Sequence, residues 1–273
     1  MATLPLWPAL FVFAALFVAP LMYFFAVSFW TVRARIMRPA FSFQNYLETI
    51  TGYGDVLVNT LAVAFGIAIV TTFLAFLFAY AIRFKLGRFA NLFLLTTLIT
   101  LFGGYLVKIY AWKSILGTDG VLNKAVLSLG LITEPVSALV YSVNGVVITL
   151  TYFLLPFAVL PIYGSLRSIE DATLEAARDL GATSWPVMRD VVLPQCQTGL
   201  MTAFTLSFLI SVGDYVTPRF VGGGAALMGT FIENQFSFGF NWPLGSAMAF
   251  TTMFATLLLV VLVRMVMRRA LQP

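Results

Sequence analysis

Six long stretches without a charged residue constrain this chain more than any other feature of its sequence. A helix rises about 1.5 Å per residue, so it needs about 20 apolar residues to cross roughly 30 Å of hydrocarbon. The six stretches are about that length or longer and cover residues 1–32, 56–82, 89–107, 135–166, 191–213 and 234–263. Hydrophobic residues make up 60% of the chain and charged residues only 10%, which indicates an integral membrane protein.

We therefore predict an all-α membrane protein with six transmembrane helices in a single transmembrane domain, residues 1–273. The apolar residues follow one another continuously, whereas the strands of a membrane barrel alternate apolar and polar residues. The first stretch lacks the basic start of a signal peptide, so we expect it to remain as the first span. The predicted helices cover residues 6–30, 56–82, 89–115, 138–165, 195–217 and 243–263.

Residue types and motifs that are rare or absent exclude several classes of functional site. The sequence has no histidine and one cysteine, Cys196, which excludes His- or Cys-based metal sites, a histidine base and an internal disulfide. It lacks the G-x-x-x-x-G-K-[ST] phosphate loop, and its net charge of +5 is scattered rather than gathered in a basic stripe. We therefore expect no catalytic residue, metal site, cofactor or nucleic-acid partner for this chain, and an energy source outside it.

The distribution of basic residues indicates the orientation. Six spans place both termini on one side of the membrane, and basic residues gather on the cytoplasmic side of short loops. The basic turn at residues 83–88 and the basic tail at residues 264–269 lie directly at span ends and favour cytoplasmic termini. The cluster of Arg33, Arg35 and Arg38 opposes this orientation, because it would then face outward. We predict cytoplasmic termini on the strength of the two span-end groups.

A polar segment separates the fourth and fifth predicted spans, at residues 166–194. Ser168 and Asp171 have the spacing of a capping box, which predicts a helix over residues 169–180. Gly181 is placed to end that helix, because glycine adopts the left-handed conformation just past a helix end. A second short helix is expected to follow before the fifth span.

The first of these helices has two unlike faces. Four apolar residues at helical spacing are expected to face inward, namely Ile169, Ala172, Ala176 and Leu180. The other side carries Asp171, Glu175, Arg178 and Asp179. Glu175 and Asp179 are like charges four residues apart, which costs a helix a few tenths of a kcal/mol unless a cation from elsewhere relieves it. The pattern indicates a docking surface for another protein, with a solvated connecting loop as the alternative.

The same segment resembles a known sequence signature. In "EAARDLGATSWPVMRDVVLP" (175–194), the triplet Glu-Ala-Ala is followed by Gly181 and then by Val191 and a hydrophobic run that ends at Pro194. This pattern is similar to the EAA motif of permease subunits in type I ABC importers, with Val191 in place of the usual Ile. Other stretches resemble the spermidine/putrescine branch of that family, among them "FSFQNY" (41–46), "KIYAWKSILGTDGVLN" (108–123) and "GDYVTPRFVGGG" (213–224).

The resemblance implies that residues 166–194 form a cytoplasmic two-helix coupling loop between helices 4 and 5, which sits in a groove of the ATPase. The residues implied in this coupling are Glu175, Ala176, Ala177, Asp179 and Gly181. Loss of Gly181 is then expected to uncouple ATP hydrolysis from uptake. The implied partners are a cytoplasmic ABC ATPase dimer that binds ATP and Mg, a second, homologous permease, and a periplasmic or extracellular solute-binding protein. The implied location is the bacterial cytoplasmic membrane.

Asp214 is the first candidate for the substrate path. An ionisable group at membrane depth is costly and is a functional candidate by default. Asp214 and its neighbour Tyr215 lie where the fifth helix is expected to break, and broken helices expose backbone groups that a substrate can use. As an alternative, Asp214 caps the next turn or pairs with a nearby cation, which would be Lys108, Lys113 or Arg219.

Tyr105, Tyr110 and Trp112 are the other path candidates, late in the third predicted span. Their rings suit a cationic cargo, since a cation–π contact contributes on the order of 0.5–2 kcal/mol. As an alternative, they belong to the belt of aromatic residues at the membrane interface.

Together these features predict the transmembrane permease of an ATP-driven, binding-protein-dependent importer that works by alternating access. The chain itself is not expected to be an enzyme, because a separate subunit would hydrolyse ATP. Resemblance to the spermidine/putrescine branch indicates a polyamine or a related small cationic amino compound, with an opine or amino acid derivative as the alternative. An ion-coupled secondary transporter would need inverted repeats or buried charges, and a membrane-embedded hydrolase would need a nucleophile with a base. Neither pattern is found.

Overall fold

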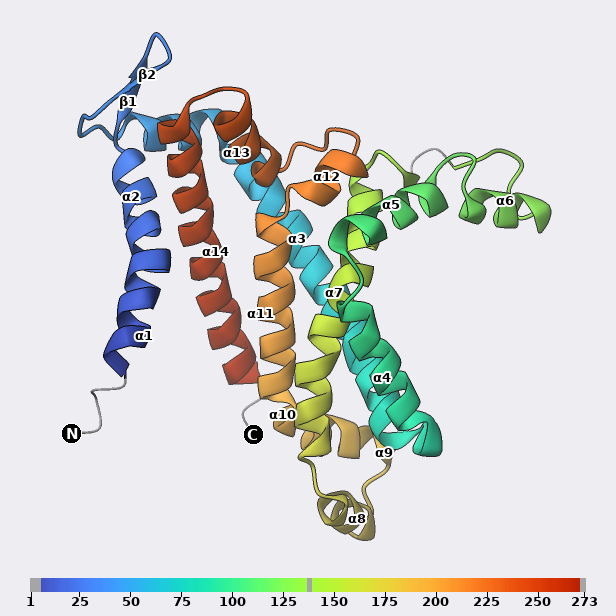
Figure 1. Ribbon diagram of the computed structural model, residues 1–273. Helices are drawn as coiled ribbons and strands as arrows, with labels where there is room; N and C mark the ends of the chain where they lie inside the picture. The colour runs from blue at the N-terminus through green and yellow to red at the C-terminus, as the bar shows by residue number, and fades with distance from the viewer. Residues whose placement is uncertain (1–5, 137–138, 271–273) are drawn as a thin grey trace. The chain divides into compact units, whose positions relative to one another are not determined.

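The computed structural model describes residues 6–136 and 139–270, which are helical along most of their length (Figure 1). This confirms the predicted helical class. The α-helices are α1 (Leu6–Phe13), α2 (Ala19–Val27), α3 (Gln44–Phe84), α4 (Ala90–Leu101), α5 (Tyr105–Leu116), α6 (Val121–Ser128), α7 (Val143–Arg167), α8 (Asp171–Asp179), α9 (Ser184–Pro186), α10 (Leu193–Gln195), α11 (Gln197–Gly213), α12 (Val216–Phe220), α13 (Met228–Ser237) and α14 (Trp242–Ala270). Short π- or 3₁₀-helical pieces adjoin them, namely η1 (Ala14–Val18), η2 (Gly87–Phe89) and η4 (Val187–Val192).

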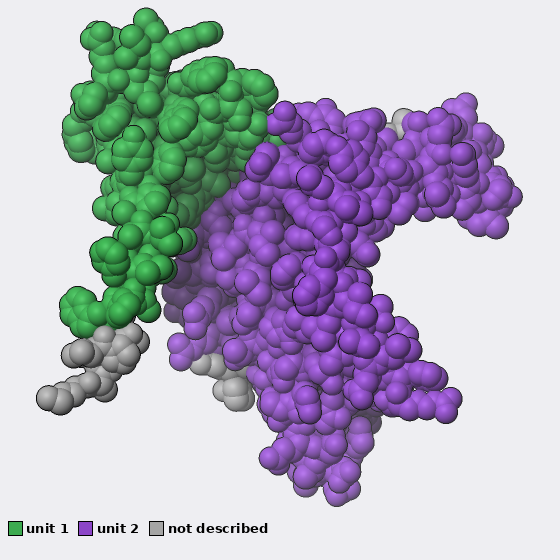
Figure 2. All heavy atoms as spheres, viewed as in Figure 1, with its two compact units in different colours: residues 1–59, 226–255 green, residues 60–225, 256–273 purple. Residues whose placement is uncertain are grey.

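The chain divides into two compact units, which are coloured separately in Figure 2. Unit 1 consists of residues 1–59 and 226–255, and unit 2 of residues 60–225 and 256–273. The division falls within α3 and within α14, because each of these helices contributes one part to each unit.

Unit 1 combines the first apolar helix with the adjoining parts of α3, α13 and α14. α1, η1 and α2 form one apolar helical stretch of 21 residues, Trp7–Val27. The unit has a small buried core of Met228, Leu244 and Met248. Aromatic rings add to it, since the ring of Phe24 lies 5.9 Å from that of Phe236 in an edge-on arrangement, a geometry that aromatic pairs favour.

A short β-hairpin in unit 1 departs from the all-α prediction. Strand β1 (Thr31–Arg33) pairs in antiparallel fashion with β2 (Ile36–Arg38). The turn residues Ala34 and Arg35 have φ angles of 51° and 62°, the left-handed backbone that a two-residue hairpin turn requires. This turn was not predicted, because the sequence lacks the glycine or asparagine that usually marks it. The arginine cluster lies here, with all three members exposed: Arg33, Arg35 and Arg38.

Unit 2 is organised around the contact between α7 and α11. At Gly199 of α11, an added Cβ would lie 2.5 Å from Ser165 Oγ and 2.6 Å from the Pro161 carbonyl oxygen of α7. The two backbones therefore approach so closely that only glycine fits, as small residues allow in membrane helices. Alanines continue this packing in the largest buried cluster, whose members include Ala75, Ala79, Ala158 and Ala203.

Four of the described helices are long and apolar enough to cross a membrane, namely Trp7–Val27, Gln44–Phe84, Val143–Arg167 and Trp242–Arg269. Two bent pairs raise the number to six if each pair is one span: Gly87–Leu101 with Tyr105–Ser128, and Ser184–Gln195 with Gln197–Gly213. The count of six spans therefore stays a prediction. The predicted start of the fourth helix at residue 138 and the predicted domain ends at residues 1 and 273 lie outside the described residues.

The prediction of one helix over residues 89–115 is wrong. α4 ends at Leu101 and α5 begins at Tyr105, with a bend of 102° between the two helical stretches. Gly103 and Gly104 lie in the break, and Gly104 has a non-helical ψ angle of 135°. Glycine leaves the helical conformation at little steric cost, so this pair ends the helix although the surrounding residues are apolar.

The predicted start of the second helix at residue 56 is also wrong. α3 begins at Gln44, because the polar residues before the span continue the helix instead of ending it. Asn45 holds this start in place, since its side-chain amide donates hydrogen bonds of 2.8 Å to the carbonyl oxygens of Ser28 and Trp30. Charged residues limit how far a helix enters the membrane, but they do not limit the helix itself.

Candidate functional site

The polar segment between α7 and α11 forms two helical pieces, as predicted. α8 spans Asp171–Asp179, and Gly181 follows it with a φ angle of +86°, which confirms the predicted left-handed helix end. The second piece runs through α9, η4 and α10 from Ser184 to Gln195. We refer to residues 168–195 as the coupling segment.

The predicted capping box is not formed. Ser168 ends α7, and its hydroxyl donates a 2.8 Å hydrogen bond to the Ser165 carbonyl oxygen. α8 therefore begins two residues later than predicted, with Glu170 as its N-cap and no side-chain cap. The favourable placement of Asp171 in the first turn remains, because a carboxylate there interacts with the positive end of the helix dipole.

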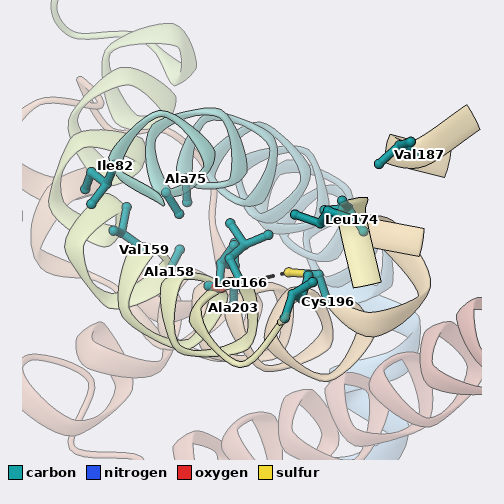
Figure 3. Packing of buried hydrophobic residues seen from close by; sticks show 13 residues of the cluster. Ala75, Ile82, Ala158, Val159, Leu166, Leu174, Val187, Cys196 and Ala203 are labelled. Atoms are coloured by element: carbon teal, nitrogen blue, oxygen red, sulfur yellow. Dashed lines mark hydrogen bonds between the residues drawn. The ribbon is translucent and has the colours of Figure 1, made fainter. Parts of the chain in front are cut away.

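Four buried apolar side chains attach the coupling segment to the bundle of unit 2, namely Ile169, Leu174, Val187 and Val192. Leu174 of α8 and Val187 of η4 are buried in the same cluster as Leu166 and Cys196 (Figure 3). Burying such a side chain contributes about 1.5–3 kcal/mol relative to leaving it in water. Burial of these side chains therefore holds the segment against the bundle.

The predicted inward face of α8 is only partly right. Ile169 is buried, but Leu180 is 90% exposed and Ala172 and Ala176 are exposed as well. The inward face instead carries Leu174, with Ala177 packed against the same cluster. The later start of α8 explains this difference, since Ile169 precedes the helix and does not set the phase of its faces.

The outward face of α8 follows from this phase. Residues of a helix are about 100° apart, so the positions opposite Leu174 and Ala177 are 172, 175, 176 and 179. Glu175, Ala176 and Asp179 are all exposed there. Three of the five residues predicted for coupling thus share one outward face, whereas Ala177 faces inward and Gly181 shapes the turn.

Two large apolar side chains on the coupling segment are also exposed: Leu180, which was expected to face inward, and Trp185, for which no role was predicted. Trp185 is 70% exposed, and Leu180 extends away from the cluster that it was expected to join. The sequence did hold a signal for Trp185, namely a tryptophan inside a charged segment. Exposed aromatic side chains are enriched at protein interfaces.

An ion pair missed by the sequence analysis joins the coupling segment to α3. The Arg83 Nη2 atom donates to Asp171 Oδ1 over 2.7 Å and to the Ile169 carbonyl oxygen over 3.3 Å. The partners are 88 residues apart in sequence, so spacing alone does not reveal the pair. Asp171 is 69% exposed, which limits the contribution of this ion pair to stability to at most about 1 kcal/mol.

The second group of predicted residues surrounds the end of α11. The helix ends at Gly213, and Asp214 leaves it with a ψ angle of 125°, which confirms the predicted break. The Asp214 carboxylate is 9% exposed. Tyr105 Oη donates to its Oδ1 over 2.7 Å, and the backbone N–H groups of Val216 and Thr217 donate to it over 3.1 to 3.4 Å.

Asp214 therefore caps the turn that follows. This is the capping role that was given as an alternative to a place in the substrate path. Lys108, one of the cations proposed to pair with Asp214, contacts other groups. Its Nζ donates to the Thr100 carbonyl oxygen and lies 5.3 Å from the centre of the Phe153 ring. Within residues 6–136 and 139–270, no ion pair involves Asp214.

Of the three aromatic candidates in the third predicted span, Tyr110 and Trp112 pack against other rings and not against Asp214. The Tyr110 ring lies 5.4 Å from that of Phe220, and the Trp112 ring lies 5.3 Å from that of Tyr152. Tyr215 is 42% exposed next to the carboxylate. The residue that does contact Asp214 is Tyr105, which adjoins the unpredicted break before α5.

Comparison with known proteins decides the family. A family model described as "Binding-protein-dependent transport system inner membrane component" matches residues 3–273. The chain belongs to this family. It is therefore the permease subunit of a type I ABC importer, as the EAA-like motif indicated, and this assignment favours the importer over the secondary-transporter and hydrolase hypotheses.

Curated relatives support the same assignment. The chain is 30% identical over 248 residues to the spermidine/putrescine transport system permease protein PotB of Escherichia coli, covering 90% of this chain and 88% of that protein. It is 30% identical over 208 residues to PotB of Haemophilus influenzae, covering 76% and 72%. A shorter match to PotC of Escherichia coli has 38% identity over 71 residues, 26% of this chain and 27% of that protein.

Solved structures of the family have the same fold. A bacterial alginate ABC transporter, crystallised in complex with an alginate pentasaccharide-bound periplasmic protein, matches with a TM-score of 0.74 and 16% identity, covering 98% of this chain and 93% of that chain. The inward-facing MetNI methionine ABC transporter matches with a TM-score of 0.53 and 18% identity, covering 81% and 97%.

Proposed function

We propose that this permease forms a translocation path together with a second, homologous permease and imports cargo by alternating access. A solute-binding protein delivers the cargo from outside, and a pair of ABC ATPases supplies the energy from the cytoplasm. The observation that carries the coupling part of this proposal is the outward face of α8, where Glu175, Ala176 and Asp179 are exposed. The same helix is anchored to the bundle on its opposite side by Leu174.

The outward face has the chemistry of a docking surface. Two carboxylates four residues apart favour a cationic partner, and Ala176 lies between them with a side chain short enough for another protein to approach closely. The exposed side chains of Leu180 and Trp185 add apolar area nearby, as protein interfaces use at their centres. ATP and Mg bind to the partner ATPase, and this chain contributes no cofactor site of its own.

The anchors of the coupling segment explain how motion of an ATPase would reach the membrane. Leu174 and Val187 pack into a cluster that includes residues of α3, α7 and α11, and Arg83 ties the start of α8 to the end of α3. Because packed interiors transmit strain instead of absorbing it, a displacement of α8 would move these helices with it.

A bulky substitution on the outward face tests the docking. Ala176→Trp should prevent the ATPase from copurifying with the permease, while the permease still folds, because the added side chain extends into solvent. Thr173→Trp is the matched control, since Thr173 is exposed on the flank of the same helix. Copurification of the ATPase with Ala176→Trp at the wild-type level would contradict the proposed docking face.

For the cargo we propose a polyamine or a related small cationic amino compound. The support is the identity to relatives named as spermidine/putrescine permeases. Asp214 does not add to this support, because its observed hydrogen bonds, from Tyr105 Oη and from the backbone of the next turn, are those of a structural cap. Uptake measured with a panel of polyamines, opines and amino acids tests the choice. Uptake of an opine or an amino acid derivative, without uptake of any polyamine, would favour the alternative.

We further propose that both termini face the cytoplasm of the bacterium. The basic residues at the ends of α3 and α14, among them Arg83 and Arg268, support this orientation through the positive-inside rule. Reporter fusions at the C-terminus test it. Activity of a cytoplasmic reporter is expected, and activity of a periplasmic reporter would reverse the topology.

A further inference from the structure

A pocket with two arginines in its wall lies where two long helices of unit 2 end. It has a volume of about 360 Å³ and is formed by the end of α3, the turn through η2 into α4, and the end of α7. The residues that line it are Ile82, Arg83, Gly87, Ala90, Tyr163 and Arg167. Two cations therefore share one space, and none of these six residues is acidic.

Arg83 uses only part of its guanidinium group within the chain. Its Nη2 atom donates to Asp171 and to the Ile169 carbonyl oxygen, and the group lies 5.0 Å from the centre of the Phe84 ring. Its Nε atom is buried and donates to no acceptor among the residues that the structure describes. A buried donor loses its hydrogen bonds to water, so it is stabilised by any acceptor that replaces them. The Nε–H group is therefore available to a ligand from outside the chain.

Arg167 adds a second positive charge to the same pocket. It is the last residue of α7 and is exposed, and no carboxylate in the described part of the chain forms an ion pair with it. Tyr163 lies one turn earlier on the same face of α7, and its hydroxyl is a further donor. An added Cβ at Gly87 would meet no atom within 4 Å, so the pocket is open on that side. This combination of charge, donors and space suits an anion.

The position of the pocket is that of a lipid headgroup. α3 and α7 are both long and apolar enough to cross a membrane, and Arg83 and Arg167 belong to their last turns. The polar headgroups of a bilayer lie just outside its hydrocarbon core, where such helices end. Phe89 and Leu92 follow the pocket at the start of α4 and are exposed, so apolar surface for hydrocarbon adjoins it.

Two arginines from different helices favour a phosphate over a carboxylate. Guanidinium groups bind both anions, but the oxygens of phosphate are arranged tetrahedrally and accept hydrogen bonds from several directions at once. The volume of about 360 Å³ lies near the lower end of the range of about 300–1,000 Å³ for small-molecule sites. The pocket therefore has room for a phosphate together with a substituent.

We propose that this pocket binds a phosphate group, held by Arg167 and by the Nε–H group of Arg83. Basic pockets between membrane helices recognise anionic headgroups, so the expected source is a phospholipid in the leaflet that holds the C-terminal ends of α3 and α7. Free phosphate is the other source of the same group. Arg83 then contacts the phosphate through Nε and the start of α8 through Nη2.

The test uses the purified transporter complex after removal of its lipids. Native mass spectrometry compares phosphatidylglycerol with a diacylglycerol of identical acyl chains, which lacks the phosphate. The wild type should prefer phosphatidylglycerol, and Arg167→Gln should weaken its binding about tenfold, because a hydrogen bond to a charged group is lost. Arg167→Lys retains the charge and should lose less. Arg88→Gln is the matched control, because Arg88 adjoins Gly87 but lies over the Phe89 ring and does not line the pocket.

A second measurement distinguishes the two sources of phosphate. Inorganic phosphate is titrated into the lipid-free complex by calorimetry, again with Arg167→Gln and Arg88→Gln. Binding of inorganic phosphate that depends on Arg167, without a preference for phosphatidylglycerol, would support the site with free phosphate as its ligand. The proposal is overturned if Arg167→Gln binds both probes as tightly as Arg88→Gln does. Efficient cross-linking of Arg167→Cys to the ATPase would also overturn it, because a protein partner would then cover the pocket.

Discussion

At the scale of single residues, Asp214 shows how a buried charge can serve the fold. Its carboxylate accepts hydrogen bonds from Tyr105 Oη and from the backbone N–H groups of Val216 and Thr217. From the sequence, an aspartate at membrane depth indicated either a substrate site or a structural cap. The structure shows the cap, because two of these donors are backbone N–H groups of the turn that follows.

Substitution of Asp214 should therefore change stability more than cargo affinity. Asp214→Ala leaves the backbone N–H groups of Val216 and Thr217 without their side-chain acceptor and should cost about 1–2 kcal/mol, or a few degrees in the unfolding midpoint of the purified complex. Asp214→Asn retains an oxygen that accepts hydrogen bonds and should lose less. The opposite pattern, an unchanged midpoint with a strongly raised KM for cargo in Asp214→Asn, would return Asp214 to the substrate path.

Gly181 is the residue whose backbone the coupling segment depends on. Its φ angle of +86° is costly for residues with a Cβ, although an added Cβ would meet nothing within 4 Å. The effect of a substitution should thus come from backbone conformation and not from lack of space.

Gly181→Val should lower the amount of cargo transported per ATP, since a β-branched residue destabilises the left-handed conformation by about 1–2 kcal/mol. Gly181→Asn should retain most coupling, because asparagine tolerates this conformation. Transport and ATP hydrolysis are measured together in proteoliposomes. Equal coupling ratios for the two variants would show that the turn conformation does not matter.

At the scale of elements, two kinds of contact hold the coupling segment, and their magnitudes differ. Burial of Leu174 and Val187 contributes several kcal/mol together, whereas the Arg83–Asp171 pair contributes at most about 1 kcal/mol because Asp171 is largely exposed. The apolar contacts stabilise the segment, and the ion pair fixes the direction in which α8 leaves α7.

The ion pair can be tested by exchange of its charges. Arg83→Gln should lower transport per ATP while the unfolding midpoint changes by only about 1–3 °C. The exchange Arg83→Asp/Asp171→Arg should recover part of the lost coupling. If Arg83→Gln transports at the wild-type ratio, the pair has no part in coupling.

The sequence predicted the helices better than their breaks. Long apolar stretches identified α3, α7, α11 and α14, because burial in a membrane dominates the free energy of such segments. The break before α5 was missed, since Gly103 and Gly104 permit a bend without requiring one. The left-handed turn at Gly181 was found because glycine and a helix end occurred together.

The candidate site was predictable to a similar extent. The outward carboxylates of α8 followed from helical spacing. The inward face was wrong, because it was extended from Ile169, which lies before the helix begins. Partners distant in sequence, such as Arg83 with Asp171 or Tyr105 with Asp214, depend on tertiary packing that periodicity does not encode.

At the scale of the whole molecule, the central claim is that this permease works only as part of an ATP-driven complex. The family assignment covers residues 3–273. In the proposed function an ATPase acts on the outward face of α8, whose opposite side packs against helices of unit 2. In the proposed function the energy source lies in a partner, which agrees with the lack of a phosphate-loop motif in this sequence.

The most direct test of this claim is the ATPase activity of the purified complex in nanodiscs, with its binding protein and a panel of polyamines, opines and amino acids. The account predicts that one cargo-loaded binding protein stimulates ATP hydrolysis well above the rate with the empty binding protein. If no ATPase copurifies with the permease, and cargo flux instead follows an ion gradient, the account is contradicted.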